Sequence, residues 1–170
     1  MEKSKKKGLV SGIVAAVFTV IAMLGFAFKW MTSNVSMGGK TSSSGIGISD
    51  WFDHVKLDAS FNKGKYIMWQ VGNVLMWFLL VVVLVAVVLA FVKMFVNKKI
   101  FNTIAKPCAI LGIILAPVWF IIMVVGSFMT LTSAGGMTSS IFPYPGAFIF
   151  ALGLFVASIA ANRSRKKSNA

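Results

Sequence analysis

Residues 36–43 read SMGGKTSS, and the GGKT within them matches the end of a phosphate-binding loop. Such a loop needs the pattern G-x-x-x-x-G-K-[ST], whose backbone amides and lysine surround the phosphates of a nucleotide. Counting back from Gly39, the position of the first glycine holds Asn34. The loop must also join a buried strand to a helix, and neither flank supplies that context. The sequence therefore predicts no nucleotide site, and we expect Lys40 to be a solvated charge.

The same pattern returns at residues 133–140 as SAGGMTSS, with Met137 in place of the lysine. A phosphate site would lose its phosphate-binding lysine by that replacement, so the repeated feature must be structural. Two successive glycines supply the positive φ angles of a tight two-residue hairpin turn. Val35 and Met37 alternate with polar residues before the first Gly-Gly pair, which is a weak strand signal. We expect a short β-hairpin whose tip is residues 38–39.

The other residues able to do chemistry are one histidine, three acids of the segment 49–66 and one cysteine. Asp50 and His54 have the i, i+4 spacing that would let them share a metal ion, but two ligands are too few, and surface solvation is the favoured interpretation. Cys108 stands alone, which excludes an internal disulfide and a paired-thiol redox site. Without a catalytic constellation, the sequence predicts a protein that is not an enzyme and that uses no cofactor or metal.

The composition places these residues on a membrane protein. Hydrophobic residues make up 58% of the 170 residues and charged residues 12%, against about 25% charged in a typical soluble domain. Four runs without a charged residue reach the roughly 20 residues that a membrane-spanning helix needs. They are Gly8–Phe28, Ile67–Phe91, Pro107–Thr130 and Phe142–Ala161. The prediction is an all-α integral membrane protein, with one domain, 1–170, built as a bundle of four transmembrane helices.

The basic residues predict the orientation of this bundle. Four lie in each of three segments, 3–7, 93–106 and 163–167, and such clusters mark the cytoplasmic side. Both termini are then cytoplasmic, and the connections 31–66 and 131–141 lie outside. We attribute the net charge of +13 to these topology signals and to attraction for anionic inner-leaflet lipids, rather than to nucleic acid. The predicted location is the cell membrane, with several passes.

The outer loop 30–66 is the predicted partner-binding region. The run SDWFDHVKL is expected to form a short interfacial helix, and its first residue, Ser49, is suited to cap that helix. In that helix we expect Trp51 and Phe52 to be exposed anchors for a partner. Asp50, Asp53 and His54 are the polar candidates beside them. The absence of cysteine from this loop favours a bacterial source.

The membrane segments offer packing material rather than chemistry. Small residues spaced four apart allow helices to approach closely; those singled out for helix packing are Gly8, Gly12, Ala109, Gly112, Ala116, Ala147 and Ala151. Trp30, Trp69 and Tyr144 are expected in an aromatic belt at the outer boundary. Trp119 follows Pro117, whose missing N–H should free a carbonyl that the indole N–H could use.

The two S-x-G-G-x-T-S-S copies also suggest a duplication. Aligning them brings the helices before them into register and defines tandem helix–loop–helix units 8–91 and 107–161. Both units would enter from the cytoplasm, so they would be parallel repeats related by rotation about the membrane normal.

In layout, four helices with both ends inside and a larger first outer loop with strand character, the chain is similar to claudin-like tetraspan proteins. The outer-loop motif of that family is G-L-W followed by two cysteines. Its nearest counterpart in this sequence is Ile48–Trp51, and no cysteine follows in the loop. The expected function is that of a non-enzymatic scaffold or accessory subunit of a membrane or cell-envelope complex. It would bind other membrane proteins, or a second copy, through the outer loop and the small-residue helix faces. The alternative is an oligomeric small channel or transporter subunit, which is less favoured because the helices carry no ionisable residue.

Overall fold

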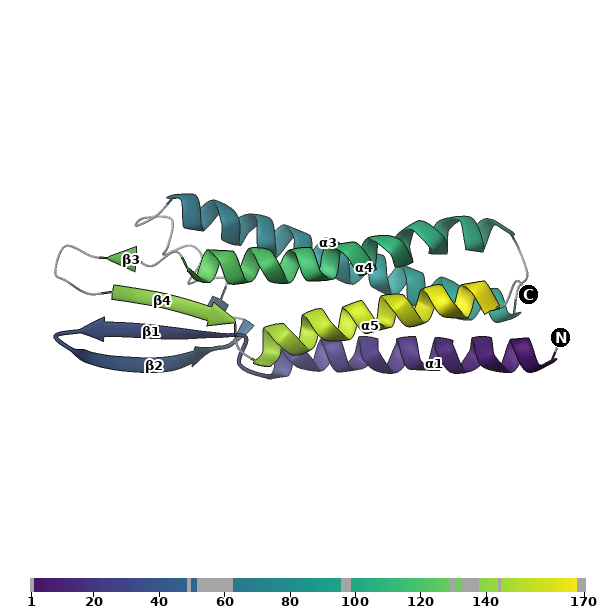
Figure 1. Cartoon of the computed structure of the whole chain (residues 1–170), viewed down its shortest axis with the longest axis horizontal. Coiled ribbons are helices and arrows are strands. Elements are labelled where there is room, and N and C mark those ends of the chain that lie inside the picture. The colour runs from purple at the N-terminus through teal and green to yellow at the C-terminus, as the bar shows by residue number, and fades with distance from the viewer. Residues whose placement is uncertain are drawn as a thin grey trace. The chain divides into compact units, whose positions relative to one another are not determined.

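The computed structural model describes residues 2–48, 50–51, 63–95, 99–128, 131–132, 138–143 and 145–167. Among the described residues, one pair of strands follows the first long helix and a second pair precedes the last, while the two middle helices follow one another directly (Figure 1). The elements are α1 (Glu2–Leu24), the 3-10 turn η1 (Gly25–Ala27), β1 (Met31–Met37), β2 (Lys40–Ile46), α3 (Lys63–Phe95), α4 (Lys99–Ser127), β3 (Leu131–Thr132), β4 (Thr138–Pro143) and α5 (Pro145–Lys167).

The prediction of four helices long and apolar enough to span a membrane is confirmed. The helices are long and apolar enough to cross a membrane over Gly8–Ala27, Tyr66–Lys93, Thr103–Ser127 and Pro145–Ser164. Large apolar side chains such as Val20, Val74 and Leu152 are exposed on them, as expected for surfaces solvated by lipid rather than by water. The last span begins three residues later than predicted, because Phe142 and Pro143 belong to a strand and Pro145 is the first helical residue.

The predicted hairpin is confirmed at its predicted tip. β1 and β2 pair antiparallel from Met31↔Ile46 to Met37↔Lys40, one residue against one. Gly38 and Gly39 connect them with φ angles of 57° and 77°. Positive φ at both central residues defines the turn type whose twist suits two antiparallel strands. Lys40 therefore begins a strand instead of opening a helix, as a phosphate-binding lysine would.

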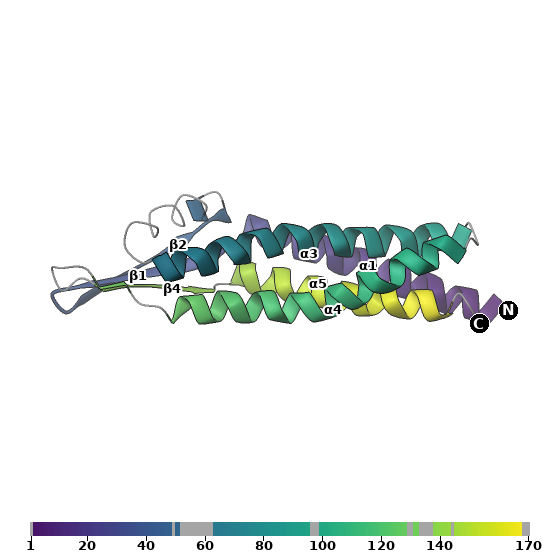
Figure 2. The same cartoon turned by 90° about the horizontal axis from the view of Figure 1, so that it is seen from above.

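The sheet has more strands than the sequence predicted, because the second connection contributes to it. β4 pairs antiparallel with β1 from Thr138↔Ser36 to Pro143↔Met31, and β3 pairs with β4. The strand order is β2-β1-β4-β3, so β1 is held on both sides. Seen from above, the strands form one thin layer (Figure 2).

The strand order does not show the rotational repeat that the sequence suggested. A rotation that exchanged the halves would join equivalent strands at the centre, whereas β1 is joined to β4. The register of the two hairpins also differs. Thr41 pairs with Ser36 in the first. Their counterparts in the repeat are Thr138 and position 133, but Thr138 pairs with Thr132. The second Gly-Gly pair lies outside the described residues. The rotational symmetry is therefore absent from the described part of the sheet.

The chain divides into two compact units. The helix unit comprises residues 1–22, 76–117 and 151–170, which are segments of all four helices. The sheet unit comprises residues 23–75 and 118–150, which contain the sheet and one end segment of each helix. Asp50 and Trp51, two of the predicted partner-binding residues, belong to the sheet unit.

Candidate functional site

Four of the five tryptophans form the core of the sheet unit. Trp30, Trp51, Trp69 and Trp119 are completely buried, and Phe150 is buried with them. The ring centroids of Trp30 and Trp119 lie 5.7 Å apart, and Phe150 lies 5.3 Å from each of them in edge-to-face geometry. Such edge-to-face pairs add stability beyond the area that they bury. These contacts join α4 and α5 to Trp30, which directly precedes β1.

Glycines let α3 and α4 approach within the aromatic core. A side chain at Gly126 would meet the Trp69 ring, whose nearest atoms lie 3.2–3.4 Å from the position of its Cβ. The Trp119 indole N–H donates to the Gly72 carbonyl at 2.9 Å. The predicted acceptor, a carbonyl freed by Pro117 on the same helix, is therefore wrong. The acceptor comes from the neighbouring helix because Trp119 points toward α3.

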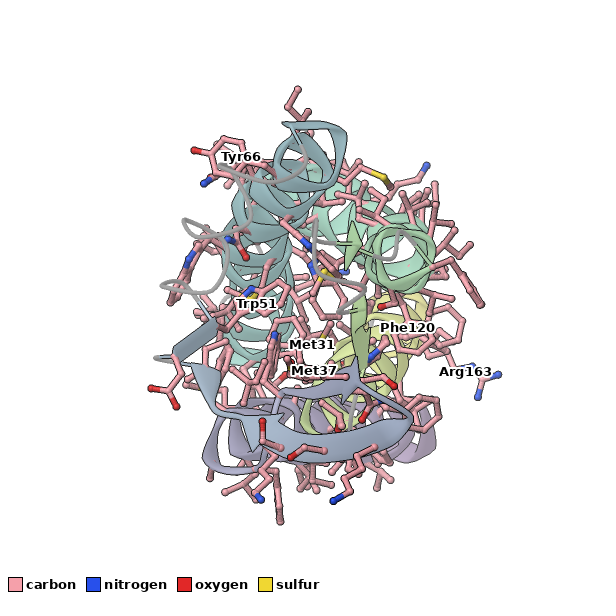
Figure 3. The ribbon with its side chains drawn as sticks, turned by 90° about the vertical axis from the view of Figure 1, so that its left-hand side faces the viewer. Met31, Met37, Trp51, Tyr66, Phe120 and Arg163 are labelled. Carbon is pink, nitrogen blue, oxygen red and sulfur yellow. The ribbon has the colours of Figure 1, made fainter. Side chains whose placement is uncertain are left out.

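Trp51 is an internal side chain, which corrects its predicted role as an exposed anchor. Its backbone N–H donates to the Gly47 carbonyl at 3.0 Å in a helical turn. Its indole N–H donates to Asn73 Oδ1 at 2.9 Å, and its ring stands edge-on to Trp69 with 4.6 Å between centroids. Figure 3 shows Trp51 and Met31 directed toward the middle of the unit and Tyr66 at its rim. A large apolar indole gains more free energy from this burial than from contact with water.

The other predicted partner-binding residues are only partly described. Asp50 is exposed, and Phe52, Asp53 and His54 lie outside the described residues. Among the described residues, no group of three or more His, Cys, Asp or Glu side chains could hold a metal ion. The binding roles of these four residues stay predictions.

The hydrogen bond between Trp51 and Asn73 gives a testable expectation. Replacing Asn73 with leucine should lower the free energy of unfolding by about 1–3 kcal/mol, because it leaves a buried N–H without an acceptor. In a Trp51→Phe background the same replacement should cost less, since no indole N–H remains to be orphaned. Thermal unfolding of the four proteins in detergent measures the difference. An equal cost in both backgrounds would contradict the assigned bond.

Two residues of the predicted aromatic belt are also internal. Trp30 and Trp69 are buried, and neither indole N–H has a hydrogen-bond partner in the described structure. Tyr144 lies outside the described residues. A tryptophan near a membrane boundary can face lipid or protein, and its position in the sequence does not distinguish the two. Burial inside the unit shows that these two rings pack against protein rather than against lipid.

Backbone contacts fix the sheet to the helices. The Trp30 N–H donates to the Ile46 carbonyl at 2.7 Å, and the Gly146 N–H donates to the Lys29 carbonyl at 3.1 Å. A Cβ at Gly146 would lie 2.7 Å from the carbonyl oxygens of both Gly25 and Lys29. Only glycine permits this approach of α5 to the end of η1. Lys29 and Trp30, the two residues directly before β1, are therefore each held by a backbone hydrogen bond.

The sheet surface that results is rich in hydroxyl groups and poor in charge. Thr41, Ser42, Ser43 and Ser44 are all exposed on β2. The strand register places Asn34 of β1 between Ser43 and Ser140, and Ser36 between Thr41 and Thr138. The Thr41 hydroxyl donates to Ser36 Oγ at 3.4 Å. The sheet thus presents small polar side chains on a hydrogen-bonded backbone, a surface suited to hydrogen bonding.

The predicted packing residues lie in helix contacts within the chain. The seven small residues Gly8, Gly12, Ala109, Gly112, Ala116, Ala147 and Ala151 are all buried. The Ser164 hydroxyl donates to the Gly8 carbonyl at 2.9 Å, and a side chain at Gly112 would collide with Ser158 and Val83. These faces are occupied by the protein's own helices. That these faces also bind other membrane proteins stays a prediction.

No protein-family model, no curated protein and no solved structure matches the chain.

Proposed function

We propose that the protein is a non-enzymatic scaffold or accessory subunit of a membrane or cell-envelope complex, and that it binds its partner through the sheet. The observation that carries this proposal is the exposed, nearly uncharged strand β2 on a sheet fixed by a buried aromatic core. Rigid presentation lowers the entropy lost when a partner binds. The small-residue helix faces are already buried, which leaves the sheet as the better surface for docking.

The alternative function, an oligomeric channel or transporter subunit, has less support. A polar path needs side chains with unused hydrogen-bonding capacity along the helices. The hydroxyls of Thr19, Ser127 and Ser158 each donate to the carbonyl four residues earlier, at 2.7–2.8 Å. These three hydroxyl donors are satisfied within their own helices, which favours a packing role over a role in conduction.

The proposal includes an orientation, with both termini in the cytoplasm and the sheet outside, inferred from the basic residues. In a Cys108→Ala background, a cysteine in place of Ser42 should react with a membrane-impermeant thiol reagent in intact cells. A cysteine in place of Arg165 should react only after the cells are permeabilised. The reverse pattern would contradict the orientation and would place the sheet in the cytoplasm.

The proposed function is tested by crosslinking in native membranes followed by purification and identification of what accompanies the protein. We expect one foreign membrane or envelope protein in a fixed ratio. A ladder of this chain alone would contradict an accessory role. Solute or ion flux through the purified protein in liposomes, absent from protein-free liposomes, would support the channel instead.

A further inference from the structure

The outer edge of β2 is an open strand edge. Among the described strands, β2 has one neighbour, β1, and stands at the end of the order β2-β1-β4-β3. A strand at the end of a sheet carries a row of backbone N–H and C=O groups on its free side, which can pair with another chain. All residues of β2 from Lys40 to Ser44 are exposed, so this edge is accessible along most of its length.

The hairpin geometry identifies which backbone groups point outward. In a two-residue hairpin the residues that flank the turn, Met37 and Lys40, form a hydrogen-bonded pair. Along antiparallel strands, hydrogen-bonded and non-hydrogen-bonded pairs then alternate. Ser42 and Ser44 therefore direct their backbone groups toward β1, and Thr41 and Ser43 direct theirs to the free edge.

This edge lacks the usual features that prevent pairing. Natural proteins protect edge strands with charged residues, proline or bulges. Residues 41–46 read TSSSGI, without charge or proline, and the register with β1 runs one to one without a bulge. The only charge of the strand, Lys40, lies at the turn. The small, exposed side chains of residues 41–44 leave room for those of an incoming strand, whereas the Lys29 side chain lies against Gly45.

The membrane restricts which strand can occupy the edge. Copies in one membrane differ by rotation about the membrane normal, and the strands run along the helix segments of their unit (Figures 1 and 2). Two β2 strands would then be parallel, with Ser43 facing Ser43 at the same height. In a parallel pair, the residues that exchange hydrogen bonds are offset by one position between the strands. Two copies at the same height lack this offset, so β2 does not pair with β2. The β3 strand of a second copy would run antiparallel to β2. It has only two residues, Leu131 and Thr132, and is too short to form a stable pair.

We propose that β2 accepts an extended, uncharged segment of a second polypeptide as a fifth strand, antiparallel to β2 and hydrogen-bonded to the backbone of Thr41 and Ser43. This inference rests on the proposed function and names its mode of binding. Backbone hydrogen bonds supply the affinity in such strand addition. The small side chains of β2 do not select the incoming strand by the size of its side chains. Specificity for the partner comes instead from the absence of charge on the edge and from the hydrogen-bonding register.

The test uses the full chain in lipid nanodiscs and a synthetic peptide with the sequence of β1, residues 31–37, which already pairs with β2 on its other side. Amide hydrogen exchange is measured residue by residue. The peptide should slow exchange at Thr41 and Ser43 by about tenfold or more. Ser42 and Ser44, already bonded to β1, should not change. A peptide with proline at its central position is the negative control.

Two variants separate edge pairing from general folding effects. Ser43→Pro removes an outward N–H and is tolerated at an edge, so it should abolish the peptide's effect on Thr41. Ser43→Val keeps that N–H and should preserve the effect. The edge proposal would be overturned if the exchange rates at Thr41 and Ser43 did not change when the peptide is added. It would also be overturned if the peptide slowed exchange at Thr41 as much in the Ser43→Pro variant as in the wild type. Crosslinking of one β2 to another in native membranes would overturn it in favour of self-pairing, while loss of every foreign partner would overturn the proposed function as well.

Discussion

Replacing Gly146 with alanine is expected to destabilise the sheet unit by about 3 kcal/mol or more, the upper end of the cost of overpacking. The added Cβ would lie 2.7 Å from the carbonyl oxygens of Gly25 and Lys29. These are backbone atoms, so a change of side-chain rotamer cannot relieve the collision. The hydrogen bond from Gly146 N–H to the Lys29 carbonyl would also lengthen.

The measurement is thermal unfolding of the purified protein in detergent. Val20→Ile is the matched control, because it adds one methyl group at a position that is 57% exposed on α1, and it should leave the unfolding temperature unchanged. Gly25→Ala should act like Gly146→Ala, since its Cβ would lie 2.7 Å from the Gly146 oxygen. Wild-type stability of both glycine variants would refute the close contact between η1 and α5.

Replacing Trp119 with alanine is the second large effect. The truncation removes a fully buried ring that contacts Trp30 and Phe150, together with the hydrogen bond to the Gly72 carbonyl. Loss of such a ring costs about 3–5 kcal/mol. Trp119→Phe should cost less, because it keeps most of the ring contacts.

Trp77→Ala is the control for this effect, since Trp77 is also helical but half exposed. Unfolding by a denaturing detergent, followed by the fluorescence of the remaining tryptophans, compares the variants. The order of stability should be Trp77→Ala, then Trp119→Phe, then Trp119→Ala as the least stable. Equal losses for the two alanine variants would show that Trp119 does not belong to a packed core.

The helices and the hairpin could be predicted because their signals are local. An uncharged run of about 20 residues has few alternatives to a membrane helix, and Gly38–Gly39 satisfies the φ requirement of its turn without help from the rest of the chain. The pairing of β1 with β4 could not be predicted in the same way. It joins Met31 to Pro143, residues far apart in sequence, and serine-rich strands give little alternation of apolar and polar residues to follow.

The tryptophans show a second limit of the sequence. Trp30, Trp51 and Trp69 were expected at a boundary or on the surface, and each is buried. An indole suits an interface and a core equally well, because it has a large apolar ring and one N–H. What decides between them is the neighbouring helix, through acceptors such as Asn73 and through glycines such as Gly126 that make space. These are tertiary contacts, which no single segment encodes.

The central claim, that β2 is the docking surface, is tested most directly by photocrosslinking in native membranes. A photoreactive amino acid is placed at position 43 on β2 or, as a control, at position 74, where Val74 is 69% exposed on α3. The claim predicts that position 43 yields one discrete crosslinked protein and that position 74 does not yield it. The same protein captured from both positions, or from position 74 alone, would contradict docking at β2.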